Sequence, residues 1–465
     1  MLRIGGQRVP SSTLLLFALD ALAVILGLFA AIVLRFHNQR VILDYLRGQH
    51  MFLRFALVIL VCEICLYYND LYGRPDSRSA IEMFTELLQA LGSGCLVLAF
   101  IYYVDDGVSL GRGIALMSGP VVLALMMVSR IILGRTRLLI QVPKRVLVVG
   151  TGLSGISAVR EIISRPELNL KVEGFLDEKG ENIGASLVNP GIIGAVKDVE
   201  AISLERGIDR VIISLTERRG NMPISQLLRL KFSGVGVEDA HSIIERVTGR
   251  IHLEQISPSW LILSDGFRKS PLLYAIKRST DIIVALLALI LTLPVMAVVA
   301  LAIWLGTGGP IFFRQERVGL KGCTFEILKF RSMRQNAEAN GPVWALRDDK
   351  RITRVGRIIR KYRLDELPQI FNVLRGEMSL VGPRPERPHF CELLEENIPF
   401  FALRHSVRPG ITGWAQIKYQ YGASIEEAKT KLEYDFFYIK HISFLLDLAI
   451  IFETAKVMMH GRGSQ

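Results

Sequence analysis

Residues 281–305 read DIIVALLALILTLPVMAVVALAIWL, an apolar run long enough to cross a bilayer as one helix. Basic residues flank this run on both sides: Lys277 and Arg278 before it, and Arg314, Arg317 and Lys321 after it. Such flanks are typical of the cytoplasmic side of a membrane, so both ends of the run are expected there. Pro294 lies near the middle, where a proline removes a backbone hydrogen bond and kinks the helix. We therefore predict a re-entrant membrane helix hairpin over 281–305, broken at Pro294.

Four further apolar runs precede this segment, at about 12–34, 51–68, 87–104 and 114–134. Each is long enough to span a bilayer, so residues 1–140 are predicted to form a four-helix transmembrane bundle. The segments after the second and fourth runs carry basic residues that favour the cytoplasm: Arg74, Arg78, Arg135, Arg137, Lys144 and Arg145. The first external loop, with Arg35, Arg40 and Arg47, does not follow this rule. Asp20 and Glu63 lie within spans, where an ionisable side chain has a function or a partner inside the bundle.

The composition agrees with a membrane protein that has basic cytoplasmic parts. Half of the 465 residues are hydrophobic, and the formal net charge is +12. Nucleic acid is not expected as a partner, because the basic residues adjoin apolar spans and no aromatic-interleaved binding motif accompanies them. The five cysteines are scattered and predict neither a disulfide framework nor a metal site.

Residues 141–268 are predicted to form a Rossmann-like α/β domain. Short apolar strands are expected at 146–149, 171–176 and 210–214, and a helical pattern follows the first of them. A glycine-rich turn separates this first strand from its helix and contains Gly150, Gly152 and Gly155.

The glycine-rich turn has two explanations that remain open. Its glycines and Asp177 at the end of the second strand fit a dinucleotide-type loop, in which the acid binds a ribose. The alternative is a turn retained for packing. A Tyr-x-x-x-Lys pair is missing, because Tyr274 is followed four places later by Arg278. This counts against a membrane-bound NAD-dependent sugar-nucleotide dehydratase or epimerase, which is one alternative function.

Residues 360–385 read RKYRLDELPQIFNVLRGEMSLVGPRP and place two adjacent carboxylates, Asp365 and Glu366, after a basic run. That run contains Arg347, Lys350, Arg351, Arg354, Arg357, Arg360, Lys361 and Arg363. Nearby guanidinium groups favour the ionised form of a carboxylate, which could then attack phosphorus. Arginine also binds phosphate in bidentate fashion. A solvated basic helix face is the alternative.

This segment and its flanks resemble the monotopic phosphoglycosyl transferases, or bacterial sugar transferase family. The resemblance covers roughly residues 270–465 and includes five blocks in family order: FFRQERVG (312–319), LKFRSM (328–333), LDELPQ (364–369), SLVGPRP (379–385) and RPGITGWAQ (408–416). It implies that residues 269–465 form a mainly α catalytic domain with the re-entrant hairpin.

The resemblance also implies a reaction. A sugar-1-phosphate would pass from a UDP-sugar, UDP-glucose or UDP-galactose, to undecaprenyl phosphate, in the first membrane step of exopolysaccharide, capsule or O-antigen synthesis. Asp365 would be the nucleophile, and Glu366 would assist the acceptor or join Asp365 in binding a Mg²⁺ cofactor. Phosphate or nucleotide contacts are expected from Lys329, Arg331, Arg360, Pro383, Arg384, Pro385 and Lys418. Lys418 is included because 417–422 reads IKYQYG where many relatives carry Asn-Gly-Arg.

Localisation and assembly follow from the same observations. We expect a multi-pass protein of the bacterial inner membrane whose catalytic domain lies on the cytoplasmic face. Partners would be the two substrates, membrane lipid and a second copy, which would bind through the N-terminal domains. Because all five blocks lie beyond residue 265, removal of residues 1–265 is expected to leave an active core. A non-catalytic scaffold for polysaccharide assembly, with an inert Asp365–Glu366 pair, is the other alternative.

Overall fold

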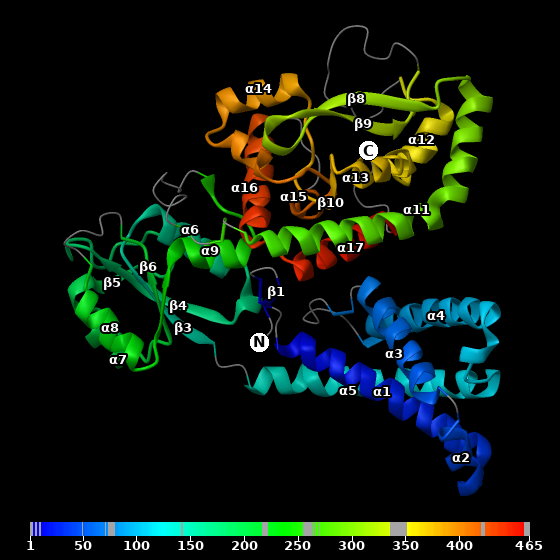
Figure 1. Ribbon diagram of the computed structural model, residues 1–465. Helices are drawn as coiled ribbons and strands as arrows, with labels where there is room; N and C mark the ends of the chain where they lie inside the picture. The colour runs from blue at the N-terminus through cyan, green and yellow to red at the C-terminus, as the bar shows by residue number, and fades with distance from the viewer. Residues whose placement is uncertain are drawn as a thin grey trace. The chain divides into compact units, whose positions relative to one another are not determined.

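The computed structural model divides into two compact units (Figure 1), essentially residues 8–142 and 143–465. It describes residues 3–4, 7–8, 11–48, 50–69, 71–72, 80–140, 143–215, 222–253, 264, 266–267, 269–334, 351–419 and 424–459. Two short strands, β1 (Arg3–Ile4) and β2 (Gln7–Arg8), pair near the N-terminus.

The first unit consists of long apolar helices. They are α1 (Ser11–Phe36), α3 (Met51–Tyr68), α4 (Ala80–Val104) and α5 (Arg112–Ile140), joined by the short α2 (Gln39–Leu46) and a 3₁₀ turn, η1 (Asp106–Val108). Each long helix has the length and composition of a membrane span, so the four predicted runs are confirmed as helices. Helix α1 packs against α5, and α3 packs against α4.

Asp20, one of the two acids within the spans, has a partner inside this unit. The Arg130 guanidinium of α5 donates two hydrogen bonds to the Asp20 carboxylate, at 2.7 and 2.9 Å. Both side chains are buried, so each charge is neutralised where water is excluded. Glu63 accepts a hydrogen bond from the Tyr72 hydroxyl. Pairing with Arg130 therefore explains how the buried charge of Asp20 is tolerated, and Glu63 has a polar contact with Tyr72.

A parallel five-stranded sheet opens the second unit and confirms the predicted Rossmann-like fold. Its strands are β3 (Lys144–Val149), β4 (Leu170–Asp177), β5 (Ile192–Ala195), β6 (Arg210–Ile213) and β7 (Gly236–Asp239), in the order β5-β4-β3-β6-β7. Helices α6 (Leu153–Ile163) and α9 (Ala240–Thr248) pack on one face, and α7 (Val199–Glu205) and α8 (Ile224–Phe232) on the other. Short 3₁₀ turns η2 (Pro166–Leu168) and η3 (Val196–Asp198) complete the domain.

The C-terminal domain is mainly helical, as predicted. Its helices are α11 (Pro271–Thr307), α12 (Arg354–Lys361), α13 (Gln369–Arg375), α14 (Pro388–Asn397), α15 (Trp414–Lys418), α16 (Ile425–His441) and α17 (Phe444–Met459). Antiparallel strands β8 (Phe312–Val318) and β9 (Thr324–Phe330) form a hairpin, and β10 (Ser379–Val381) pairs in parallel with β11 (Gly410–Thr412). Its described residues also include the 3₁₀ segments η5 (Leu320–Gly322), η6 (Leu364–Glu366) and η7 (Phe401–Ser406).

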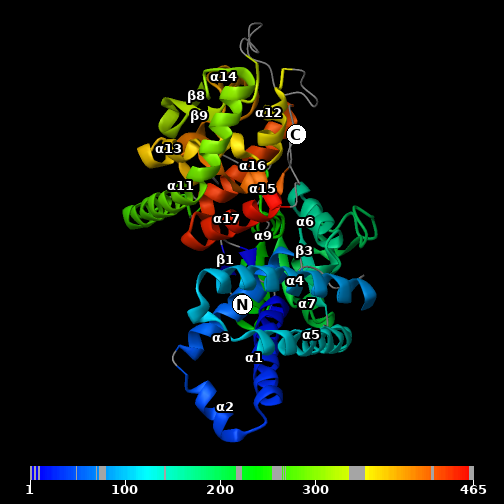
Figure 2. The same ribbon diagram turned by 90° about the vertical axis from the view of Figure 1, so that its right-hand side faces the viewer.

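Helix α11 contains Pro294 and bends between two arms (Figures 1 and 2). Ala285, before the proline, lies in one buried cluster with Val373 of α13. Ile303, after it, lies in another with Phe330 of β9. A straight helix of 37 residues would extend about 55 Å. The bend instead brings both arms against the same domain.

Helix α16 joins the Rossmann-like and C-terminal domains within the second unit. Lys440 Nζ and His441 Nε2 lie 2.8 and 2.6 Å from the Glu245 carboxylate of α9. Ile251 and Leu253, from the segment after α9, belong to the hydrophobic core of the C-terminal domain. Residues before 268/269, where we placed the domain boundary, therefore contribute to the core of the C-terminal domain.

Candidate active site

The turn η6 presents the Asp365–Glu366 pair between α12 and α13. Helix α12 begins with a side-chain cap, in which Thr353 Oγ1 accepts a 2.8 Å hydrogen bond from the Gly356 N–H. After α12 ends, Arg363 adopts a positive φ of 53°, which turns the chain into η6. The turn lies against β9, the strand that carries Lys329. Residues far apart in the sequence are thus brought to one place.

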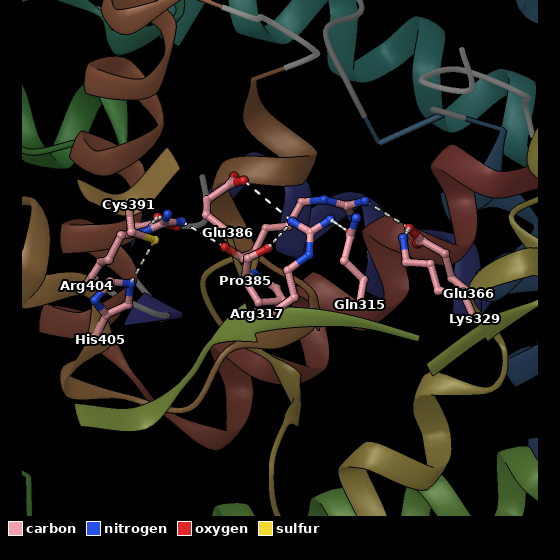
Figure 3. A network of polar contacts seen from close by, with 11 residues as sticks. Gln315, Arg317, Lys329, Glu366, Pro385, Glu386, Cys391, Arg404 and His405 are labelled. Carbon is pink, nitrogen blue, oxygen red and sulfur yellow. Dashed lines mark hydrogen bonds and ion pairs between the residues drawn. The ribbon is translucent and has the colours of Figure 1, made fainter. Parts of the chain in front are cut away.

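Glu366 is surrounded by cations (Figure 3). Its Oε1 accepts hydrogen bonds from Lys329 Nζ at 3.1 Å and from Arg384 Nη2 at 2.9 Å. Arg363 Nη1 lies 3.8 Å from the other oxygen. Burial alone would raise the pKa of Glu366, but Arg384, Lys329 and Arg363 hold this pKa well below its usual range. Glu366 is therefore a fixed negative charge at any physiological pH.

Asp365 has a different environment from its neighbour. Burial, with a further contribution from the charge of Glu366, raises the pKa of Asp365 to about 6, although Lys329 and Arg360 oppose the rise. Among the described residues, no side chain donates a hydrogen bond to Asp365, and none pairs with the Arg360 guanidinium. We expected basic neighbours to hold Asp365 ionised, but they act mainly on Glu366. A carboxylate with this pKa is nevertheless about nine-tenths ionised at pH 7.

Five of the seven predicted phosphate or nucleotide contacts therefore lie in or beside this site. Lys329 and Arg384 bind Glu366 directly, and the charge of Arg360 acts on Asp365. Pro383 and Pro385 flank Arg384 in an irregular segment that follows β10. Arg363 was not among our candidates, although its position two residues before Asp365 on a basic run was a usable signal.

Arg331 lies elsewhere and has a structural role. Its guanidinium is buried and donates hydrogen bonds to the main-chain oxygens of Gly308 and Gly309, at 2.6 and 2.8 Å, and to Thr307 Oγ1 at 2.6 Å. These groups end helix α11, where carbonyl oxygens lack intrahelical partners. Arg331 therefore caps the membrane helix and is not positioned to bind a phosphate beside Asp365.

Lys418 also lies apart from the carboxylate pair. Its Nζ is 4.7 Å from the centre of the Trp414 ring. The Trp414 indole N–H in turn donates a 2.7 Å hydrogen bond to the Gly249 carbonyl at the end of α9. Lys418 thus adjoins the contact between the two domains, and its predicted phosphate role has no support in these contacts.

A metal site formed by both carboxylates does not fit this geometry. Among the described residues, no group of three or more His, Cys, Asp and Glu side chains is arranged to hold a metal ion. Both oxygens of Glu366 face cations, which would repel Mg²⁺. Asp365 is the carboxylate of the pair that remains available, and it could hold Mg²⁺ together with substrate phosphates.

The glycine-rich turn of the Rossmann-like domain is packed against Ser214 at the end of β6. Gly150 has a φ of +99°, and a Cβ there would lie 2.5 Å from the Ser214 carbonyl oxygen. A Cβ at Gly155 would lie 2.6 Å from Ser214 Oγ, and the Gly152 N–H donates to the Ser214 carbonyl. These contacts support the packing explanation for the turn.

Asp177 also serves its own domain. Its carboxylate accepts hydrogen bonds from the Glu181 N–H at 3.0 Å and from Asn182 Nδ2 at 3.5 Å. Burial opposes ionisation, but these hydrogen bonds lower the pKa of Asp177. The acid predicted to bind a ribose thus orders the turn that follows β4, and dinucleotide binding stays a prediction.

Comparison with known proteins places the similarity in the part of the chain that carries this site. The family model described as "Bacterial sugar transferase" matches residues 272–461. The UDP-N-acetylgalactosamine-undecaprenyl-phosphate N-acetylgalactosaminephosphotransferase of Aeromonas hydrophila is 43% identical over 239 residues, which are 51% of this chain and 56% of that protein.

Two UDP-glucose:undecaprenyl-phosphate glucose-1-phosphate transferases are also similar. The Klebsiella pneumoniae protein is 34% identical over 319 residues, which are 67% of this chain and 67% of its own length. The Caulobacter vibrioides protein is 42% identical over 185 residues, which are 39% of this chain and 69% of its own length. The chain therefore spans between about half and two thirds of the length of these relatives.

Proposed function

Because this chain belongs to the bacterial sugar transferase family, we propose that it transfers a sugar-1-phosphate from a UDP-sugar to undecaprenyl phosphate and releases UMP. The observation that carries this proposal is the contrast between the two carboxylates. Glu366 is bound by cations, whereas Asp365 is mostly ionised at neutral pH and receives no hydrogen bond from a described side chain. One acid is thus available for attack while the other is held in place.

In the first step, a carboxylate oxygen of Asp365 attacks the phosphorus that carries the sugar. The bond from this phosphorus to the bridging oxygen breaks, and UMP leaves with that oxygen and its electron pair. The product is a phosphosugar joined to the Asp365 carboxylate as an acyl phosphate. No proton transfer is needed, because the nucleophile is already a carboxylate and UMP leaves as a phosphate anion.

In the second step, a phosphate oxygen of undecaprenyl phosphate attacks the same phosphorus. The bond to Asp365 breaks, the carboxylate is regenerated, and undecaprenyl-diphosphate-sugar leaves. Both steps build negative charge around phosphorus, and preorganised cations stabilise such charge. Arg360 would bind the phosphoryl oxygens, since its guanidinium has no described partner and its charge reaches Asp365.

Glu366 orients the neighbouring cations in this scheme. By accepting hydrogen bonds from Lys329 and Arg384, it holds two positive charges beside the reacting phosphate. Mg²⁺ is proposed to bind Asp365 together with the phosphates of the donor, and it would spread the charge that develops at phosphorus. The steps above rely on the protein's own residues.

The membrane arrangement is part of the proposal. Helix α11 would re-enter and leave the same leaflet, because both of its arms pack against one domain and Arg331 holds its end to β9. The catalytic domain would then lie on the cytoplasmic face of a bacterial inner membrane, where a UDP-sugar can meet the phosphate of a lipid. Assembly of copies through the N-terminal domains stays a prediction.

Release of UMP tests the proposal. Protein in nanodiscs with undecaprenyl phosphate would be incubated with UDP-glucose, UDP-galactose and UDP-N-acetylgalactosamine, of which at least one should yield UMP. Asp365→Asn should abolish turnover, because an amide is a far poorer nucleophile, whereas Glu392→Gln at an exposed position of α14 should not. Intact-mass analysis without acceptor should find a phosphosugar adduct on the wild type and on Glu392→Gln, but not on Asp365→Asn. An adduct on Asp365→Asn would place the nucleophile elsewhere.

A further inference from the structure

Arg384 reaches Glu366 from a segment that has no regular secondary structure. Residues 383–387 follow β10 and belong to neither a helix nor a strand. A long side chain on such a segment can hold a 2.9 Å contact only if its backbone is fixed by other means. The position of Arg384 therefore depends on what binds the main chain around it.

Four successive carbonyl groups in this segment each accept a hydrogen bond. The Gly410 N–H donates to Pro383, and the Val318 N–H donates to Glu386, each at 2.9 Å. Guanidinium groups donate to the two carbonyls between them, each at 3.0 Å. Arg404 donates to the Arg384 carbonyl, and Arg317 donates to the Pro385 carbonyl. Figure 3 shows Arg404 and Arg317 approaching from different elements. Arg404 is the donor to the residue that binds Glu366.

Arg404 is itself held in one orientation. Its Nε and Nη2 donate to Asp435 Oδ2 of α16 at 3.1 and 2.8 Å, and Nη2 also reaches the Arg384 carbonyl. Both charged side chains are buried, at 6% and 2% exposed, and the Arg404 guanidinium lies 5.0 Å from the Phe401 ring centre. A planar fork can satisfy a carboxylate and a carbonyl together, which a lysine ammonium cannot do from the same position.

We propose that Arg404 is a positioning residue of the transfer reaction: it fixes the main-chain carbonyl of Arg384, so that the Arg384 guanidinium stays on Glu366 beside Asp365. The proposal rests on the function proposed above. Arg404 touches no reacting atom in this role. Its effect on the rate passes through Arg384 and the charge that Arg384 places next to the carboxylate pair.

Arg404→Lys tests the proposal, because it retains the charge opposite Asp435 and removes the fork. We expect UMP release to fall between about tenfold and a hundredfold, as misplaced catalytic groups lose rate on this scale. The protein should stay folded because the charge opposite Asp435 remains, with a somewhat lower thermal unfolding temperature because a buried hydrogen bond is lost. The acid limb of the pH–rate profile should move to higher pH, since a positive charge leaves the neighbourhood of Asp365. Arg375→Lys, at an exposed position on α13, is the matched control.

A double variant separates positioning from stability. In an Arg384→Ala background, Arg404→Lys should have no further effect on the rate, because the group through which it acts is gone. If Arg404→Lys folds poorly, Arg404→Met with Asp435→Leu removes the pair without leaving a buried charge and should show the same shift of the acid limb. An unchanged acid limb, or rate losses that multiply in the double variant, would overturn the proposal. Failure of the proposed function would appear separately, as absent UMP release by the wild type.

Discussion

Replacing Glu366 with glutamine should lower the pKa of Asp365. The Asp365 pKa is about 6 instead of the ordinary 3.8, with burial as the larger cause and the Glu366 charge as the next. A like charge on the adjacent residue commonly shifts a carboxyl pKa by about one unit or more, so removing the Glu366 charge should lower the pKa of Asp365 by about one unit, or about 1.4 kcal/mol. Lys329, Arg384 and Arg363 would then face Asp365 without a compensating charge, which lowers the pKa further.

The sign of the effect on activity follows from the nucleophile. Only ionised Asp365 can attack, so the rate is present above its pKa and is lost as the pH falls through it. The wild type should lose adduct formation around pH 6, and Glu366→Gln should keep it to about pH 5 even if its maximal rate is lower.

Single-turnover formation of the phosphosugar adduct between pH 4.5 and about 8 measures this shift without interference from the second step. Glu392→Gln should follow the wild-type profile, because this acid lies at an exposed position on α14. An acid limb that stays near pH 6 in Glu366→Gln, or that moves upward, would refute our account of the pair.

Three further predictions concern α11. Arg331→Met should destabilise the protein by about 2 to 3 kcal/mol, since the carbonyls at the end of α11 lose a charged donor. The stability of Arg331→Lys should lie between that of the wild type and that of Arg331→Met. Thermal unfolding in detergent measures both variants. Cysteines at two exposed positions, Leu272 in the first turn of α11 and Lys321 beyond its end, should react with impermeant reagent from the same face. Labelling from opposite faces would contradict the re-entrant path. Pro294→Leu should favour a straight helix and lower activity.

Local patterns in the sequence predicted the elements well, because they depend on neighbouring residues. The apolar runs became helices, and the strands expected at 146–149, 171–176 and 210–214 are β3, β4 and β6. The β8–β9 hairpin was missed, since β8 is largely exposed and shows little alternation. Gly322, with a φ of +79° in the connecting turn, was the signal that could have indicated it.

The destinations of long basic side chains could not be predicted in the same way. Lys329 lies on β9, and Arg331 directly follows this strand. Lys329 binds Glu366, whereas Arg331 caps α11. Successive residues of a strand point to opposite faces, so the sequence alone would place Lys329 and Arg331 on the same face and would not distinguish their partners. Tertiary contacts decide which partner each side chain meets. A basic motif therefore predicts that a phosphate site is present, but it does not predict which of the basic residues form that site.

Helix α16 has a consequence for how this protein melts. It binds Glu245 of the Rossmann-like domain through Lys440 and His441, and it holds Arg404 through Asp435. An element shared in this way cannot unfold with one domain and stay folded with the other, so the two domains should lose structure in a single cooperative transition. Removing residues 1–265 would also take Ile251 and Leu253 out of the C-terminal core. A shortened chain that begins before α9 should therefore retain a sharper thermal transition than one that begins at residue 266.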